Sequence, residues 1–173
     1  MAVGSLGRIG RSERPVARRS TPTTGSLPPV IDRGLTHVAL TIRDADASID
    51  FYARFGGFDV VHERTDPDTG RRVVWISDRT RPFVLVLIEV PEPAYPLAGS
   101  NHLGVGVADR AEVDRLAQLA RAEGCLALAP TDSGPPVGYW AIIRDPDGHQ
   151  LEVSHGQEVA LVVDGADDVT PPA

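Results

Sequence analysis

Two histidines and two glutamates in this sequence have the types and positions of ligands for a divalent metal ion. His37 and His102 each lie in a short segment of alternating apolar residues, and Glu89 and Glu152 each lie in a later segment. The separation is 52 residues from His37 to Glu89 and 50 residues from His102 to Glu152. A pair that occurs twice at matched places is a stronger signal than any single histidine or carboxylate. We therefore predict that the four side chains converge on one cation.

The ligand types narrow the chemistry of such a site. Imidazole and carboxylate groups suit Ni²⁺, Zn²⁺, Fe²⁺, Mn²⁺ or Co²⁺. The single cysteine, Cys125, excludes an internal disulfide and every multi-cysteine zinc or iron–sulfur site. A divalent ion polarises a carbonyl or enediolate oxygen of a substrate. Glu89 or Glu152 would then be the catalytic base that moves a proton.

Composition excludes several other classes of function. All 17 basic residues are arginine, which rules out lysine Schiff-base chemistry and a phosphate-loop lysine. Residues 1–34 hold six arginines against two acidic residues, a net charge of +4; since the whole chain is −7, residues 35–173 carry −11. An acidic body argues against nucleic acid as a partner. The longest strongly apolar run, 83–88, is six residues, too short for a membrane span. We expect a cytoplasmic protein that binds a small-molecule substrate.

The elements that position the four ligands come from an internal repeat. Segment 34–42 recurs as 100–107, with an offset of 65 residues between the two histidines. The apolar residues alternate in both copies, which predicts a half-buried strand with the histidine on its other face. A helix follows each strand, with Asp44 or Asp46 as the cap of the first and Asp109 as the cap of the second.

Three further strands complete each copy, so the predicted order is βαβββ twice and the fold class is α+β. The expected strands are 60–65, 73–77 and 83–90 in the first copy, and 125–129, 137–144 and 150–154 in the second. Tyr139 and Trp140 lie on one of these strands, and we interpret them as candidate substrate contacts, with aromatic packing as the alternative. The expected boundaries are a disordered basic extension over 1–33, a domain over 34–156 with modules 34–98 and 99–156, and an acidic tail over 157–173.

Three segments together resemble the vicinal oxygen chelate superfamily, which includes glyoxalase I, methylmalonyl-CoA epimerase, extradiol dioxygenases and fosfomycin- or bleomycin-resistance proteins. They are the strand at 36–39, the helix at 48–52 and the closing turn and strand at 145–152. The resemblance covers about residues 34–156. It implies paired modules that form a curved mixed β-sheet cup, with helices outside and a metal ion inside. Glyoxalase I has His, Glu, His and Glu at the positions that match the four predicted ligands.

The resemblance implies a divalent-metal-dependent, glyoxalase-like enzyme. It would act on a small substrate with vicinal oxygens by metal-assisted proton transfer, as an isomerase, lyase or epimerase. An extradiol dioxygenase-like oxygenase and a non-catalytic drug- or ligand-binding resistance protein are the alternatives. Thr41 and Pro93 stand where bacterial glyoxalase I has glutathione-binding residues, and Ile142 stands where the dioxygenases have a tyrosine. In this superfamily the cup forms within one chain or between the two chains of a homodimer, and the sequence leaves both open.

Overall fold

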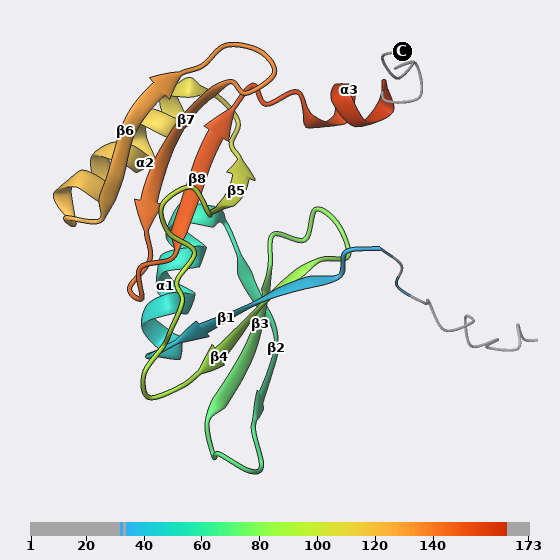
Figure 1. Cartoon of the computed structure of the whole chain (residues 1–173), viewed down its shortest axis with the longest axis vertical. Helices are drawn as coiled ribbons and strands as arrows, with labels where there is room; N and C mark the ends of the chain where they lie inside the picture. The colour runs from blue at the N-terminus through green and yellow to red at the C-terminus, as the bar shows by residue number, and fades with distance from the viewer. Residues whose placement is uncertain (1–31, 33, 166–173) are drawn as a thin grey trace, which may run out of the picture. The chain divides into compact units, whose positions relative to one another are not determined.

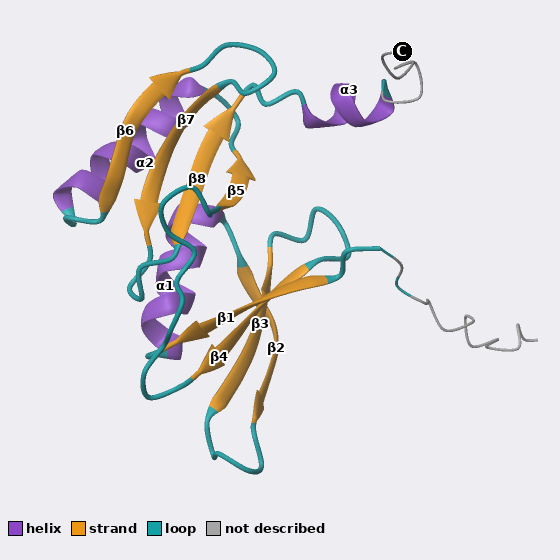
Figure 2. Cartoon of the chain, in the orientation of Figure 1, coloured by secondary structure: helices purple, strands orange, loops and turns teal. Residues whose placement is uncertain are grey.

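The computed structural model describes residue 32 and residues 34–165 of the chain. These residues form two four-stranded sheets, and the two modules that contain them can be followed in Figures 1 and 2. The first module contains β1 (His37–Ile42), α1 (Ala45–Gly56), β2 (Asp59–Thr65), β3 (Arg72–Ser77) and β4 (Val84–Glu89). The second contains β5 (Leu103–Gly106), α2 (Arg110–Ala122), β6 (Leu126–Asp132), β7 (Tyr139–Arg144) and β8 (Gln150–His155). The predicted βαβββ repeat and the α+β fold class are confirmed.

The two sheets have the same topology. The strand order is β1-β4-β3-β2 in the first sheet and β5-β8-β7-β6 in the second. In each sheet the opening strand pairs parallel with the closing strand, and the remaining pairs are antiparallel. A parallel pair needs a crossover connection, and α1 and α2 begin these crossovers. The opening and closing strands, which carry the predicted ligands, are therefore neighbours in both sheets.

The helix boundaries follow from the residues at their ends. The Asp44 carboxylate accepts a hydrogen bond from the backbone N–H of Ala47 at 3.0 Å, and Asp109 accepts from the N–H of Glu112 at 2.8 Å. These bonds satisfy donors that have no partner inside the helix. Gly57 ends α1 in the left-handed region, with φ of 68°, where a residue without a Cβ is favoured. Asp44 is thus the cap of α1, one of the two residues predicted for it.

The core lies between each sheet and its helix. Leu40 and Ile42 of β1 are 3% and 0% exposed, and they belong to one apolar cluster with the aromatic residues of α1. In the second module, Leu151 and Val153 of β8 are fully buried in the same cluster as the apolar residues of α2. Burial of alternate strand residues leaves the other face of each sheet uncovered by its helix. The predicted histidine faces are these uncovered faces.

The two modules are joined through the turn before β8. The Tyr52 hydroxyl of α1 donates to Asp145 at 3.0 Å, and both side chains are buried. His149, 2% exposed, contacts the carbonyl oxygen of Thr41 through Nε2 at 3.0 Å and accepts from the N–H of Leu97 through Nδ1 at 3.0 Å. Burial raises the pKa of Asp145 above its usual range. The polar side chains of this junction are buried, and most of their hydrogen-bond partners are backbone groups.

The segments outside the two modules differ in what the structure describes. The predicted basic extension over 1–33 lies almost wholly outside the described residues. In the predicted tail over 157–173, the structure adds a short helix, α3 (Val159–Asp164). Four of its apolar side chains are between 56% and 70% exposed. In the part of the chain that the structure describes, no helix is both long and apolar enough to cross a membrane.

The junction gives a first prediction. Tyr52→Phe removes the hydrogen bond to Asp145 and keeps the ring in the core, so we expect the free energy of unfolding to fall by roughly 1.5–3 kcal/mol, as for bonds to charged groups. Tyr95→Phe is the control, because Tyr95 is 95% exposed and should change nothing. Urea unfolding of both variants is the measurement. Equal stabilities of the two variants would show that the junction bond contributes nothing.

Candidate metal centre

The uncovered face of the first sheet carries His37. By strand alternation His37 shares its face with Ala39, and Ala39 lies beside Val86 of β4. Val86 in turn lies opposite Trp75 of β3. The His37 ring is exposed, and its Nδ1 lies 3.0 Å from the hydroxyl of Thr36. This face is therefore mostly apolar, with one histidine at the start of β1.

Glu89 does not lie on this face, so the structure does not bring it together with His37 as the four-ligand prediction expects. His37 pairs with Val84 at one end of the β1–β4 ladder, and Glu89 pairs with Ile42 at the other end. Glu89 also has the parity of Leu85 and therefore projects toward the helix side of the sheet. The prediction relied on the similar His-to-Glu separations. Separation along the chain does not fix the face of a strand on which a residue lies.

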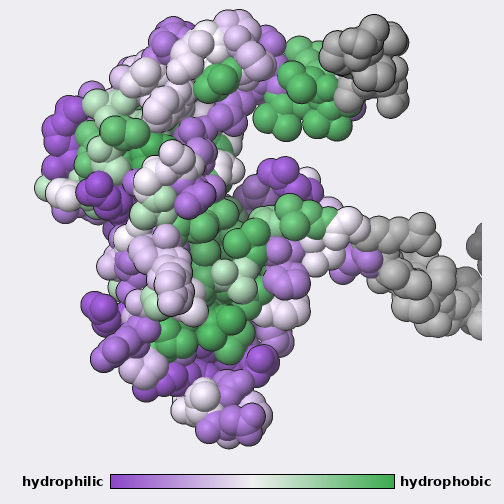
Figure 3. Space-filling view, in the orientation of Figure 1, coloured by the Kyte–Doolittle hydropathy of each residue, from purple (hydrophilic) through white to green (hydrophobic). Residues whose placement is uncertain are grey.

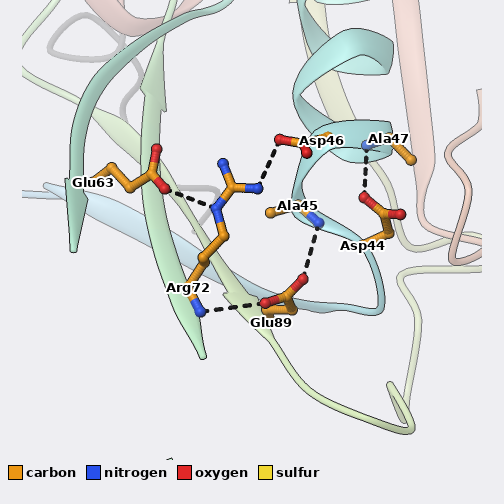
Figure 4. Close-up of polar contacts among 7 residues, drawn as sticks. All are labelled: Asp44, Ala45, Asp46, Ala47, Glu63, Arg72 and Glu89. Atoms are coloured by element: carbon orange, nitrogen blue, oxygen red, sulfur yellow. Dashed lines mark hydrogen bonds and ion pairs between the residues drawn. The ribbon is translucent and has the colours of Figure 1, made fainter. Parts of the chain in front are cut away.

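The structure gives Glu89 a different role. Its carboxylate accepts hydrogen bonds from the backbone N–H of Ala45 at 3.4 Å and of Arg72 at 3.3 Å (Figure 4). The Arg72 guanidinium reaches Glu63 and Asp46, each at 2.7 Å. Through these hydrogen bonds Glu89 links the first turn of α1 to the start of β3. A negative group at a helix N-terminus is favourable there.

The second sheet does bring its two predicted ligands together. Glu152 of β8 lies beside Gly104 of β5, on the face that His102 shares. His102 Nε2 and Glu152 Oε2 are 3.5 Å apart. The Glu152 side chain is 8% exposed and that of His102 is 38% exposed. A Cβ added at Gly104 would meet no described atom within 4 Å, so the space in front of the pair is open.

Two further contacts orient this pair. His102 Nδ1 lies 3.1 Å from the carbonyl oxygen of Ser100, so Nδ1 carries the hydrogen that is donated. In a neutral ring, Nε2 then has a free electron pair. The Gln157 amide donates to Glu152 Oε1 at 2.5 Å, which leaves Oε2 toward His102. Sequence reasoning missed Gln157, since its position after the last strand gave no signal.

The facing atoms of the pair are the chemical signature of the site. A carboxylate oxygen and an imidazole nitrogen that carries no hydrogen both offer electron pairs, so at 3.5 Å the two atoms need either a proton or a metal cation near both. Metal–nitrogen and metal–oxygen bonds are about 2.0–2.2 Å, so one ion can contact both atoms at this separation. The donor types also suit a divalent ion. His102 and Glu152 therefore fit a metal.

The described chain assembles only part of the predicted set. Among residues 32 and 34–165, no three His, Cys, Asp or Glu side chains lie close enough together to hold a metal ion. The register explains the missing glutamate. Gly104, two residues after His102, pairs with Glu152, whereas Ala39, two residues after His37, pairs with Val86. The first module thus has Val86 where the second has Glu152.

The two predicted substrate contacts lie on opposite faces of the second sheet. Tyr139 donates to Asp114 of α2 at 2.6 Å, and Arg110 lies over its ring at 4.7 Å. The hydrogen bond to Asp114 raises the pKa of Tyr139 above its usual value. Tyr139 therefore lies on the helix side, where its contacts match the alternative of aromatic packing. Trp140 lies opposite Ser154, on the same face as the ligand pair.

A cavity of about 680 Å³ lies on the uncovered face of the first sheet. His37 is at its edge, and Ala39, Val86 and Trp75 form part of its wall. Figure 3 shows hydrophobic surface gathered over this part of the first module. The two uncovered faces thus have different characters. The first offers an apolar cavity with one histidine, and the second offers a paired histidine and carboxylate.

Comparison of the sequence with known proteins identifies the family of this chain. Residues 34–153 match the Glyoxalase/Bleomycin resistance protein/Dioxygenase superfamily. The chain belongs to this superfamily, as the sequence resemblance implied. An uncharacterized protein of Pseudomonas aeruginosa is 40% identical over 126 residues, which cover 71% of this chain and 89% of that protein.

Solved structures support the same fold. Glyoxalase I of Leishmania major, described as trypanothione-dependent, is similar with a TM-score of 0.58 and 21% identity, over 79% of this chain and 98% of that one. The genomically encoded fosfomycin resistance protein of Listeria monocytogenes, solved as a mutant with Mn(II), has a TM-score of 0.57 and 17% identity, over 76% and 99%. A possible glyoxalase from Bacillus cereus has a TM-score of 0.54 and 22% identity, over 71% and 99%. At these identities the likeness shows the fold.

Because the two glutamates have different environments, we expect their substitution to affect the free energy of unfolding differently. Glu89→Ala removes the acceptor at the start of α1, and we expect the free energy of unfolding to fall by about 0.5–2 kcal/mol, as for other lost helix caps. Glu152→Gln should leave it unchanged or raise it in metal-free protein, because an amide can donate to His102 Nε2 and still accept from Gln157. Urea unfolding in the presence of a chelator measures both. A large loss in Glu152→Gln would mean that Glu152 has a structural role.

Proposed function

We propose that this chain is a divalent-metal-dependent enzyme that acts on a small substrate with two adjacent oxygens. The reaction would be a metal-assisted proton transfer of the isomerase, lyase or epimerase type. The observation that carries the proposal is the pair of facing electron-pair donors, His102 Nε2 and Glu152 Oε2, on an open face of the second sheet. A bound divalent cation would draw electron density from the two substrate oxygens and make the hydrogen on the adjoining carbon more acidic.

The remaining ligand is proposed to be His37, contributed by a second copy of the chain. His37 lies on the uncovered face of its own sheet and is not grouped with His102 and Glu152 in the described chain. Two uncovered faces, one from each copy, would together enclose the ion and the cavity. The active form would then be a homodimer with one site at each junction between copies.

This arrangement has three protein ligands. With Val86 at the position that would match Glu152, and Glu89 bound to the start of α1, the first module supplies one donor to the ion. Two histidines and one carboxylate would hold the ion and would leave part of its coordination free for two adjacent substrate oxygens. Ni, Zn, Fe, Mn and Co remain compatible with this donor set.

The residues of the chain have distinct parts in the proposed reaction. Ser100 holds the His102 ring by its Nδ1, which directs Nε2 to the open face. Gln157 occupies one oxygen of Glu152 and leaves the other to face the site. Glu152 Oε2 faces the site and would be the group that accepts a proton from the carbon beside the substrate oxygens. Glu89 takes no part, since it projects from the other face of its sheet.

The proposed ligand set also suits a second candidate function. Two histidines with one carboxylate form the ligand set typical of non-haem iron oxygenases. An extradiol-type, ring-cleaving oxygenase would have this set, and its reaction would consume oxygen in the presence of Fe²⁺ and a catechol. Ile142 lies opposite Glu152 and offers no group for proton transfer. Metal-dependent conversion of substrate without oxygen uptake would favour the proton-transfer enzyme.

Metal content is the direct test of the proposed ligands. Reconstituted wild-type protein should retain about one divalent ion per chain, whereas His102→Ala and Glu152→Gln should each retain below about 0.1, because a preformed site fills readily and a broken one does not. Glu89→Gln is the matched control and should retain the wild-type content. Elemental analysis after gel filtration gives these values. Loss of metal from Glu89→Gln with retention by Glu152→Gln would overturn the assignment.

The same assay tests the origin of the third ligand. His37→Ala alone and His102→Ala alone should each bind poorly. When the two variants are refolded together, each mixed dimer has one intact site, so metal binding should partly return. Failure of the mixture to bind more metal than either variant would contradict a site shared between copies. Metal binding by His37→Ala at the wild-type level would remove His37 from the ligand set.

Gln157 gives a graded prediction. Groups that orient metal ligands through hydrogen bonds change metal affinity by roughly 10- to 100-fold when they are removed. We therefore expect Gln157→Ala to weaken metal binding by this factor without changing the free energy of unfolding of metal-free protein. Glu158→Ala, one position further along, is the control and should leave affinity unchanged. Titration calorimetry measures both, and equal affinities would show that Gln157 does not position Glu152.

A further inference from the structure

The cavity on the first sheet has a continuous apolar floor that the proposed proton transfer does not by itself require. The floor residues lie on adjacent strands and face the same side as His37; they are Ala39, Val73, Trp75, Val84, Val86 and Ile88. Val73 and Val86 are only 6% and 9% exposed, so they form the base of the cavity. The volume of about 680 Å³ is in the range of sites that hold small organic ligands.

The floor extends in one direction from the proposed metal ligand. In the β1–β4 ladder, Val84 lies beside His37, and Ile88 lies beside Thr41, four residues further along. At about 3.3 Å per residue this is a distance of roughly 13 Å. A ligand whose two oxygens lie near His37 therefore has an apolar surface for the rest of its length. The site therefore has room for a polar end of the ligand near His37 and for an apolar remainder along the floor.

Trp75 gives this surface a flat aromatic wall. It lies opposite Val86 at the middle of the floor and is 39% exposed. The His62 ring packs against it edge-on, with the ring centroids 5.0 Å apart. This contact favours one orientation of the indole. A held indole beside aliphatic side chains suits an aromatic or branched aliphatic group.

The charges at the edge of the cavity cancel. Arg64 and Arg81 line it together with Asp32 and Asp66, a net charge of zero. An Asp66 carboxylate oxygen lies 3.5 Å from a guanidinium nitrogen of Arg64. The carboxylate also accepts hydrogen bonds from the backbone N–H and the hydroxyl of Thr69, and these bonds lower the pKa of Asp66. Arg81 lies 3.8 Å from Asp78. A balanced edge over an apolar floor favours an uncharged ligand body over a multiply charged one.

We infer that the substrate carries, beyond its two adjacent oxygens, an uncharged apolar body that is aromatic or branched aliphatic. This body lies on Val86 and Ile88 against Trp75. Only the placement of the two oxygens near His37 rests on the proposed function. The apolar site itself is independent of a metal, so the two can be tested separately.

The first arm of the test uses metal-free protein and the uncharged fluorescent probe N-phenyl-1-naphthylamine. Val86→Thr places a hydroxyl on the floor at nearly constant volume, and we expect roughly five- to tenfold weaker probe binding because the hydroxyl must be desolvated. Trp75→Ala, at a partly exposed position, should weaken binding by roughly tenfold or more. Val60→Thr is the control, because Val60 is exposed and lies opposite Ile76, on the other face, and it should bind as wild type.

The second arm uses metal-loaded protein and two hydroxamates, which present the same pair of adjacent oxygens. Benzohydroxamate should bind at least tenfold more tightly than acetohydroxamate, and Trp75→Ala should remove this difference. Probe binding without hydroxamate binding would uphold the apolar site and overturn the metal proposal. Equal binding of the two hydroxamates, or no loss of probe binding in Val86→Thr and Trp75→Ala, would overturn the inference about the substrate.

Discussion

Side chains in a β-strand alternate between the two faces of the sheet, and this constraint decides which residues of the chain can share a site. Each helix covers one face of its sheet and buries alternate residues such as Leu40 and Val153. What remains on the other face is available for chemistry. His37, His102 and Glu152 have the parity of that face, whereas Glu89 and Tyr139 do not. The assignment of functional and structural residues follows from this single geometric rule.

The approach of His102 to Glu152 places an imidazole nitrogen and a carboxylate oxygen 3.5 Å apart, where a proton or a metal cation can hold them together. Both groups offer electron pairs, and Glu152 is largely buried beside an open, glycine-lined space. Glu89 shows the contrast, because its carboxylate accepts hydrogen bonds from two backbone N–H groups and joins α1 to β3. Glu152 instead has one oxygen bonded to the Gln157 amide and the other facing His102.

The two modules share a topology and differ in the chemistry of their uncovered faces. The register places Val86 where the second module has Glu152, so the first face carries an apolar cavity and the second a paired histidine and carboxylate. Neither face is a complete site in the described chain. Because the cavity lies on one face and the paired histidine and carboxylate lie on the other, the proposed enzyme needs both faces together. This separation also explains why a second copy is the natural source of the missing ligand.

The sequence by itself determined the repeated βαβββ order, the cap of α2 and the faces of the two histidines, and it narrowed the cap of α1 to two residues, because alternation, capping and glycine stops are local properties of the chain. It could not determine that β4 places Glu89 on the helix side at the far end from His37, nor that Tyr139 packs on α2. The chain between each histidine and its glutamate includes loops whose lengths differ between the two modules. A similar number of residues between histidine and glutamate therefore does not give the same strand register. Only the pairing of β1 with β4 and of β5 with β8 decides which side chains meet, since it depends on hydrogen bonds between segments far apart in the chain.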